Sequence, residues 1–241
     1  MKRRQFLKTT SSTGAAIFAS SLTNCAQAGQ QQRPAASANN SLKIPEGGMI
    51  PVAFALSDGA TMIDFAGPWE VFQDVTVAAG GRMQQPFKLF TVSEKTEPIR
   101  TSAGMKVVPE YTFETAPAPK IVVIPAQFGN AALHKYLQRV YEQTDVTMSV
   151  CTGAFQLGKA GLLAGKEATT HHEFYDQFEK QFPDVKLRRG LRFVEGTKIS
   201  TAGGLTSGID LALRVVERYF GRAIAEQTAA YMEYQSKGWV V

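Results

Sequence analysis

Residues 146–155, with the sequence VTMSVCTGAF, constrain the fold of this chain more than any other stretch. Alternating apolar residues end in Cys151, and a Thr-Gly pair then leads into an apolar segment rich in alanine, glycine and leucine. This order predicts a strand that turns sharply into a helix, with Cys151 on the turn at the carboxyl edge of a sheet. Helix N-terminal amides beside the sulfur would favour the thiolate, which is the nucleophilic form of cysteine. The alternative is a small buried hydrophobic residue at a strand end.

The rest of the chain alternates predicted strands and helices after residue 49. Two apolar runs, residues 50–56 and 120–125, are typical of strands that are buried on both faces. Further strands are predicted at 86–93, 167–171, 191–195 and 198–201, with a hairpin over 99–108. Helices are predicted with Pro68 in a first turn, over 131–143, 154–163 and 174–182, from the Thr206-Ser207 pair to residue 220, and over 223–235. This alternation predicts an α/β fold with a mostly parallel sheet covered on both faces.

Several separated segments are predicted to meet at one edge of that sheet. In such sheets ligands bind beyond the carboxyl ends of the strands. The segments that fall there contain Asp64, residues 125–126, Cys151 and residues 203–204. Their convergence favours a catalytic role for Cys151 over a structural one.

Residues 1–28 are predicted to be a twin-arginine export signal. Arg3 and Arg4 stand just before an apolar pair, and the mildly apolar segment that follows is too short to span a bilayer. Small residues favour cleavage after Ala28, whereas the residues before Cys25 look like a lipoprotein box and leave a lipid anchor as the alternative. We therefore expect an exported, periplasmic protein without a membrane span.

Residues 29–48 are rich in Gln, Ala, Ser and Pro and are predicted to be a flexible linker, so the folded domain is expected at residues 49–241. The formal net charge is +5, but basic residues of the leader contribute +4, which leaves about +1 (5 − 4) for the remainder. Nucleic acid is therefore not implied as a partner. Removal or lipidation of Cys25 would leave Cys151 as the only thiol, so no intrachain disulfide is expected.

Four segments resemble, in order and spacing, the PfpI superfamily of class I glutamine amidotransferase-like domains. They are DFAGPWEVF, VCTGAF, ATTHH, and ISTAGGLTSGIDLAL with a terminal MEYQ. The resemblance covers about residues 50–235 and is closest to the branch of isonitrile hydratases and the sensor domains of AraC-type regulators. It implies a flavodoxin-like three-layer sandwich, a homodimer, and a cysteine nucleophile on a strained elbow.

The resemblance also implies roles for individual residues of this sequence. Cys151 would be the nucleophile, and Thr152 would supply a backbone amide or a hydroxyl beside it. Asp64 would hydrogen-bond the thiol and shuttle a proton. The alternative for Asp64 is a helix-capping or turn residue without a part in chemistry.

A substrate and oxyanion pocket is expected around Gly153, Ala126, Gln127, His171 and Gly204. Many relatives have Pro-Gly-Gly after the preceding strand, where this chain has Pro-Ala-Gln. A Cβ at Ala126 would narrow the pocket or redirect an amide, which puts the oxyanion role of this loop in question.

The histidines and the missing motifs narrow the chemistry. Proteolytic members of the superfamily have His directly after the cysteine, where this chain has Thr152. Residues 201–204, Thr-Ala-Gly-Gly, stand in the part of the chain where true glutamine amidotransferases have His-x-Glu. His171 and His172 are expected on a strand, where neighbours point to opposite faces, so only one would face the site. No third ligand accompanies them, so no metal site is expected.

These features predict a cysteine-dependent hydratase that acts on a small carbon-nitrogen multiple bond, with an isonitrile as the type substrate, and so a hydro-lyase. The chemistry requires no metal, nucleotide or redox cofactor. One alternative is a periplasmic sensor or binding domain that keeps the pocket and performs no reaction. Another is a deglycase or glyoxalase-like enzyme that uses the same thiol on a reactive carbonyl.

Overall fold

The structure is a computed structural model that describes residues 40–46 and 48–241. The predicted export signal, its cleavage after Ala28 and the lipid anchor at Cys25 lie outside the described residues, as does most of the predicted linker. Within the described ranges, no helix combines the length and apolar character needed to cross a bilayer.

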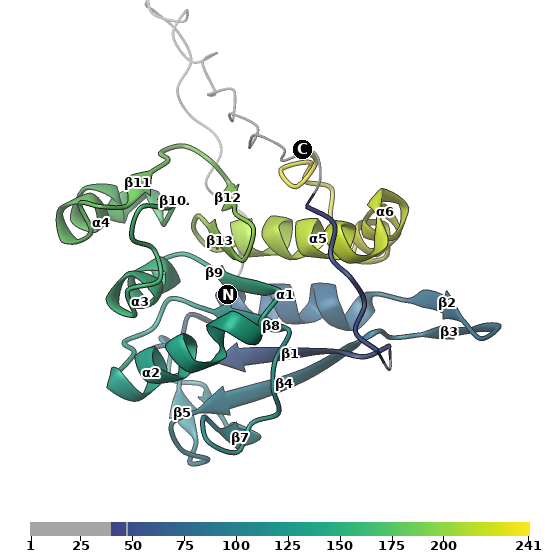
Figure 1. The fold of residues 1–241 in the computed structure, drawn as a ribbon, viewed down its shortest axis with the longest axis horizontal. Helices are drawn as coiled ribbons and strands as arrows, with labels where there is room; N and C mark the ends of the chain where they lie inside the picture. The colour runs from purple at the N-terminus through teal and green to yellow at the C-terminus, as the bar shows by residue number, and fades with distance from the viewer. Residues whose placement is uncertain (1–39, 47) are drawn as a thin grey trace, which may run out of the picture. The chain divides into compact units, whose positions relative to one another are not determined.

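A seven-stranded sheet lies at the centre of the described part of the chain (Figure 1). Its strands are β1 (Ile50–Ala55), β4 (Phe87–Ser93), β7 (Tyr111–Thr112), β8 (Ile121–Ile124), β9 (Val146–Ser149), β12 (Phe193–Glu195) and β13 (Ile199–Ala202). Their order across the sheet is β12-β13-β9-β8-β1-β4-β7. All neighbours pair in parallel except β12 and β13. The predicted mostly parallel sheet is therefore confirmed.

The apolar runs of the central strands divide their side chains between two cores. In β1, Val52 and Phe54 face one core, and Ala53 and Ala55 face the other. Strand β8 alternates in the same way between its odd-numbered and even-numbered residues. Because successive side chains of a strand point to opposite faces, a strand covered on both sides needs apolar residues at every position. This requirement explains the uninterrupted apolar runs of the sequence.

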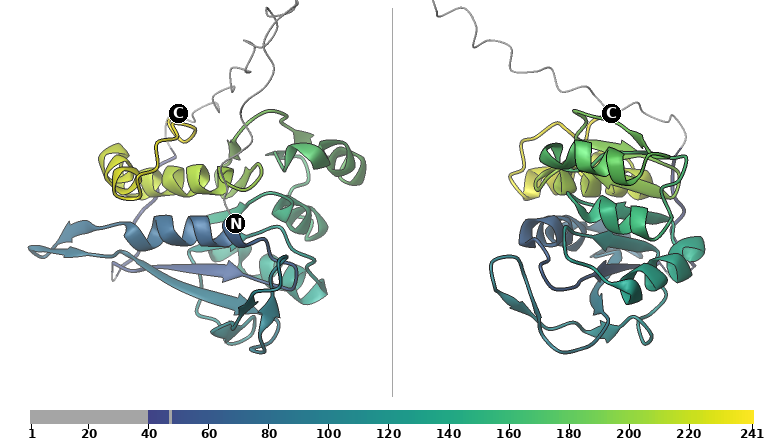
Figure 2. Two further views of the ribbon diagram at one scale, coloured as in Figure 1. Left: turned by 180° about the vertical axis from the view of Figure 1, so that it is seen from behind. Right: turned by 90° about the vertical axis from the view of Figure 1, so that its left-hand side faces the viewer.

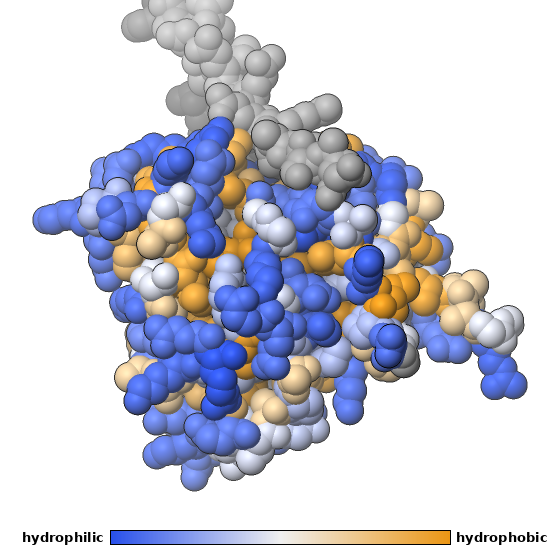
Figure 3. Space-filling model, viewed as in Figure 1, coloured by the Kyte–Doolittle hydropathy of each residue, from blue (hydrophilic) through white to orange (hydrophobic). Residues whose placement is uncertain are grey.

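Helices cover both faces of the sheet and form the outer layers of the sandwich, as two further views show (Figure 2). One face is covered by α1 (Met62–Asp74) and α5 (Ser207–Phe220), with α6 (Arg222–Tyr231) packed beside them. The other face is covered by α2 (Ala131–Val140) and α3 (Gly153–Lys159), and α4 (Tyr175–Gln181) packs on α3. Polar side chains cover much of the face seen in Figure 3, with apolar side chains between them. The predicted three-layer α/β sandwich is confirmed.

Short ribbons and single turns complete the described chain. The ribbons are β2 (Val77–Ala79) with β3 (Arg82–Gln84), β5 (Ile99–Arg100) with β6 (Lys106–Val107), and β10 (Glu167–Ala168) with β11 (Lys186–Leu187). The 3-10 turns are η1 (Tyr141–Gln143) and η2 (His172–Phe174). The β5–β6 ribbon lies where the sequence predicted a hairpin, whereas the β2–β3 ribbon and β11 were not predicted.

Two sequence predictions near the site are wrong. Helix α1 begins at Met62, so Pro68 lies inside it and not in its first turn, and Asp64 is part of the helix. A proline within a helix removes one backbone donor, and the packing of the buried residues of α1 outweighs that loss. The predicted strand 167–171 pairs only as far as Ala168, because the N–H of Thr169 donates to the side-chain Oγ1 of Thr201 at 2.8 Å.

Backbone hydrogen bonds join the segments that leave the carboxyl ends of the strands. The N–H of Cys151 donates to the carbonyl of Gly203 at 2.8 Å, and the N–H of Thr61 donates to the carbonyl of Ala126 at 2.9 Å. The first bond joins the segments that follow β9 and β13, and the second joins the segment after β8 to the start of α1. The segments that the sequence placed at this edge therefore meet there.

Candidate functional site

The elbow at Cys151 holds its backbone in the left-handed region. Cys151 has φ of +57°, a conformation that non-glycine residues rarely adopt and that costs energy. The hydroxyl of Thr170 donates to its carbonyl at 2.9 Å, which helps to fix the turn. Gly153 begins α3 against the end of β8, and a Cβ there would lie 2.2 Å from the carbonyl oxygen of Ile124. Only glycine allows this approach, so the Cys-Thr-Gly order follows from the geometry of the turn.

Asp64 is fully buried and faces the Cys151 thiol from α1. Its Oδ2 accepts the N–H of Ala126 at 3.1 Å, while its Oδ1 has no partner of ordinary hydrogen-bond geometry in the described part of the chain. Burial raises the pKa of this carboxyl to about 7 from its ordinary value of 3.8. The Ala126 N–H, the Cys151 thiol and the Leu205 N–H lower this pKa and only partly offset the burial.

The Cys151 thiol is a buried, neutral group in the free protein. Burial and then the charge of Asp64 raise its pKa to about 11, and hydrogen bonds from Thr152 and Leu205 lower it only partly. This corrects the expectation that helix amides favour a thiolate here. Helix α3 is only seven residues long, and desolvation together with a neighbouring carboxylate outweighs its amides.

Thr152 and Leu205 surround the sulfur. Thr152 stands at the N-cap of α3, and its backbone and its side chain both lower the pKa of the Cys151 thiol. The backbone of Leu205 lowers the pKa of both the thiol and the Asp64 carboxyl. Leu205 has φ of +54° and was not among the predicted residues. The signal that could have found it is its place between the Gly-Gly pair and the Thr-Ser pair that opens α5.

Three of the predicted oxyanion residues, Gly153, Ala126 and Gln127, make hydrogen bonds to other groups of the protein. The N–H of Gly153 donates to Val150, and the N–H of Ala126 holds Asp64. The side chain of Gln127 turns into the protein, where its Oε1 accepts the N–H of Ser57 at 2.5 Å and its Nε2 donates to a carbonyl of β1. These contacts do not fit an oxyanion hole, and they make the loop after β8 a rigid holder for Asp64.

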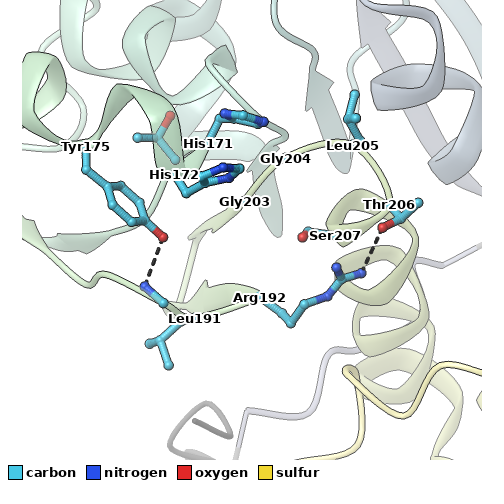
Figure 4. Close-up of a pocket in the computed structure, with 12 residues that line it drawn as sticks. His171, His172, Tyr175, Leu191, Arg192, Gly203, Gly204, Leu205, Thr206 and Ser207 are labelled. Carbon is cyan, nitrogen blue, oxygen red and sulfur yellow. Dashed lines mark hydrogen bonds between the residues drawn. The ribbon is translucent and has the colours of Figure 1, made fainter. Parts of the chain in front are cut away.

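The two adjacent histidines lie on the same side of one cavity, because the strand predicted for them is absent from the described residues. They lie at the turn into η2 and not on a strand, and their rings stack at 4.5 Å between centroids. Both line a cavity of about 360 Å³ (Figure 4). The His171 ring lies over Gly204, where a Cβ would be 2.1 Å from the ring. Cys151 does not line this cavity, but two residues of the cavity wall hydrogen-bond its backbone: the Thr170 hydroxyl donates to the Cys151 carbonyl, and the Gly203 carbonyl accepts the Cys151 N–H.

Metal ligands do not gather in the described part of the chain: no three His, Cys, Asp or Glu side chains there come together as a candidate site.

The fold and the site define a class of protein: an α/β sandwich with a cysteine on a strained strand-to-helix elbow and a buried carboxyl group beside the thiol. The chain belongs to the DJ-1/PfpI family, whose model matches residues 51–218. The predicted family membership is confirmed.

Individual relatives agree with the predicted branch. The chain is 27% identical to the isonitrile hydratase of Pseudomonas putida over 191 residues, which cover 77% of this chain and 78% of that protein. It is 24% identical to the HTH-type transcriptional regulator GbdR of Pseudomonas aeruginosa, over 76% of this chain and 50% of the regulator. Among solved structures, a ThiJ/PfpI family protein from Pseudomonas syringae matches with a TM-score of 0.69 and 25% identity, over 79% of this chain and 77% of that one.

Proposed function

We propose that this protein is a cysteine-dependent hydratase that adds water to a small carbon-nitrogen multiple bond, with an isonitrile as the type substrate. The observation that carries the proposal is the pairing of a buried Cys151 thiol with an Asp64 carboxyl whose pKa is raised to about 7. A carboxyl with a pKa near neutrality can both take and return a proton during turnover. The distant similarity to an isonitrile hydratase supports the same chemistry.

The first step joins the sulfur to the substrate. The Asp64 carboxylate takes the proton of the Cys151 thiol as the sulfur bonds to the terminal carbon of the isonitrile. Asp64 then gives this proton to the same carbon, and the product is a thioimidate in which carbon carries hydrogen, sulfur and a double bond to nitrogen. A neutral thiol suits this step, because Asp64 then deprotonates the sulfur only as the carbon-sulfur bond forms.

The second step releases a formamide. Asp64 takes a proton from water as the water oxygen bonds to the thioimidate carbon, and it delivers a proton to the substrate nitrogen. The carbon-sulfur bond of the resulting adduct breaks, the hydroxyl becomes a carbonyl, and its proton returns through Asp64 to the Cys151 sulfur. The net reaction converts an isonitrile and water into an N-substituted formamide, with both residues regenerated.

Turnover of an alkyl isonitrile by purified protein tests the proposal. We expect formamide to form with the wild-type protein and not with Cys151→Ala, and we expect Asp64→Asn to be slower by about 10²–10⁴-fold. Asp184→Asn is the matched control, because it makes the same chemical change on an exposed carboxyl group. Equal rates in the wild type and Cys151→Ala, or no turnover in any of these proteins, would reject the assignment.

A binding domain without catalytic activity is the second candidate. It is favoured by the high pKa of the Cys151 thiol and by the similarity to a transcriptional regulator. A protein of this kind would bind a small molecule at the same edge of the sheet and would release it unchanged. Recovery of intact isonitrile from a saturable complex would favour this candidate over the hydratase.

Export and assembly stay predictions. We propose a periplasmic homodimer. Mass analysis of the mature N-terminus would distinguish cleavage after Ala28 from a lipid at Cys25, and light scattering of the purified protein would give its oligomeric state. An intact N-terminus or a monomer would contradict the respective prediction.

A further inference from the structure

The cavity beside the histidine pair presents hydrogen-bond donors and no acidic side chain. Its wall contains His171, His172, Tyr175, Arg192 and Ser207, and no Asp or Glu takes part (Figure 4). A pocket of about 360 Å³ has the size of a small-molecule site. The ligand that fits this cavity is therefore one that can accept hydrogen bonds from these donors.

Arg192 is held in place from behind. Its Nε donates to Oδ2 of the fully buried Asp210 at 2.6 Å, and its Nη2 reaches the same carboxylate and also Oγ1 of Thr206 at 3.2 Å. Asp210 is not part of the cavity wall. Hydroxyl groups of Tyr234 and Ser236 donate to Asp210 as well. The guanidinium is thus fixed with its Nη1 without an acceptor among the described residues.

Ser207 and Tyr175 each have a hydroxyl proton that no described residue accepts. Ser207 is 4% exposed, lines the cavity, and makes no side-chain hydrogen bond within the described ranges. The hydroxyl of Tyr175 accepts the N–H of Gly190 at 2.9 Å, so its own proton is free for another acceptor. Both hydroxyl groups lie at the cavity, so each can donate a hydrogen bond to an acceptor that enters it.

The first amides of helix α5 offer no free hydrogen-bond donors to the cavity. Helix α5 begins at the cavity, but its first amides are already used: Ser207, Gly208 and Ile209 donate to the carbonyls of residues 204, 205 and 206. His171 is similarly fixed, because its Nδ1 accepts the N–H of Glu173 at 3.3 Å, which leaves the proton of the neutral ring on Nε2. Side chains and not a helix terminus therefore define the site.

We propose that this cavity binds a carboxylate group of the substrate, next to the reacting thiol. A carboxylate has several acceptor positions and no donor, which matches a wall of donors that includes a guanidinium. Thr170 and Gly203 line the cavity and hydrogen-bond the backbone of Cys151. One small molecule can therefore occupy the cavity with its acid group and present its other end to Cys151. The inference rests on the proposed function and specifies its substrate class as a short-chain acid that carries a carbon-nitrogen multiple bond.

Substrate pairs test the proposal on the full protein. The test compares 3-isocyanopropanoate with its methyl ester. We expect kcat/KM to be at least about tenfold higher for the acid, because its charged group accepts hydrogen bonds from the cavity wall. Ser207→Ala and Tyr175→Phe each remove one hydroxyl and leave the Arg192–Asp210 pair intact. Each variant should reduce the ratio of kcat/KM for the acid to kcat/KM for the ester by about threefold or more, mainly through a higher KM for the acid. Ser102→Ala, an exposed serine, is the control and should leave the ratio unchanged.

A binding measurement separates this inference from the hydratase proposal. Calorimetric titration of the wild type and Ser207→Ala with propanoate, propanamide and inorganic phosphate requires no turnover. We expect propanoate to bind the wild type more tightly than propanamide or phosphate does, and Ser207→Ala to weaken only propanoate. If propanoate binds in this way while no isonitrile is hydrated, the hydratase proposal fails and the carboxylate site stands. Equal binding of propanoate and propanamide, tighter binding of phosphate, or an unchanged affinity in Ser207→Ala would overturn the carboxylate site.

Discussion

Replacement of Asp64 by Asn should change how stability depends on pH. Burial raises the pKa of this carboxyl from 3.8 to about 7, so the folded protein binds the proton more tightly than the unfolded chain does. The stabilisation from the bound proton is complete below about pH 4 and is lost as pH rises toward 7. At about 1.4 kcal/mol per pH unit, the loss amounts to roughly 4 kcal/mol above pH 7.

Asp64→Asn cannot titrate, so it does not share this loss. The variant has a fixed cost because its buried amide lacks partners, but that cost is the same at every pH. We therefore expect the free energy of unfolding of Asp64→Asn, relative to the wild type, to increase by roughly 4 kcal/mol between pH 4 and pH 8. The residue that we propose as the proton carrier thus destabilises the fold at neutral pH.

Urea denaturation followed by circular dichroism at several pH values measures this difference. Groups that titrate in both proteins cancel in the comparison, and Asp184→Asn should follow the wild type because its carboxyl is exposed. A difference between Asp64→Asn and the wild type that stays within about 1 kcal/mol over this pH range would refute the argument from burial.

Two further predictions concern the elbow. The pH at which iodoacetamide begins to alkylate Cys151 should be lower in Asp64→Asn than in the wild type, because the charge of Asp64 helps to raise the pKa of the thiol; an unchanged profile would show that this charge has no effect. Gly153→Ala should destabilise the protein by more than about 2 kcal/mol in urea, because its Cβ would meet the carbonyl oxygen of Ile124 at 2.2 Å. Gly161→Ala, where space is open and only the positive φ is strained, is the control and should cost about 1 kcal/mol; equal costs would contradict the clash.

Local patterns in the sequence were sufficient for the architecture and for the position of the elbow. Uninterrupted apolar runs require strands covered on both faces, and the helix from Ser207 to Phe220 was predicted with its observed ends. The Cys-Thr-Gly order predicts an elbow because each of those residues has a steric or polar reason to stand there. Cys151 could thus be nominated from the elbow itself, whereas the role of Asp64 was an expectation from the resemblance.

The pKa values and the hydrogen-bond partners of Cys151 and Asp64 depend on tertiary contacts. The pKa of Cys151 depends on burial and on a carboxylate from α1, and neither is visible in the elbow sequence. The N–H of Ala126 holds Asp64, and the histidines stack at a turn where the sequence pattern suggested a strand. Arg192 lines the cavity and pairs with Asp210 on α5, a contact that the local sequence does not predict. Local patterns report the conformational preferences of neighbouring residues, whereas desolvation, charge and hydrogen bonding depend on groups that only the folded chain brings together.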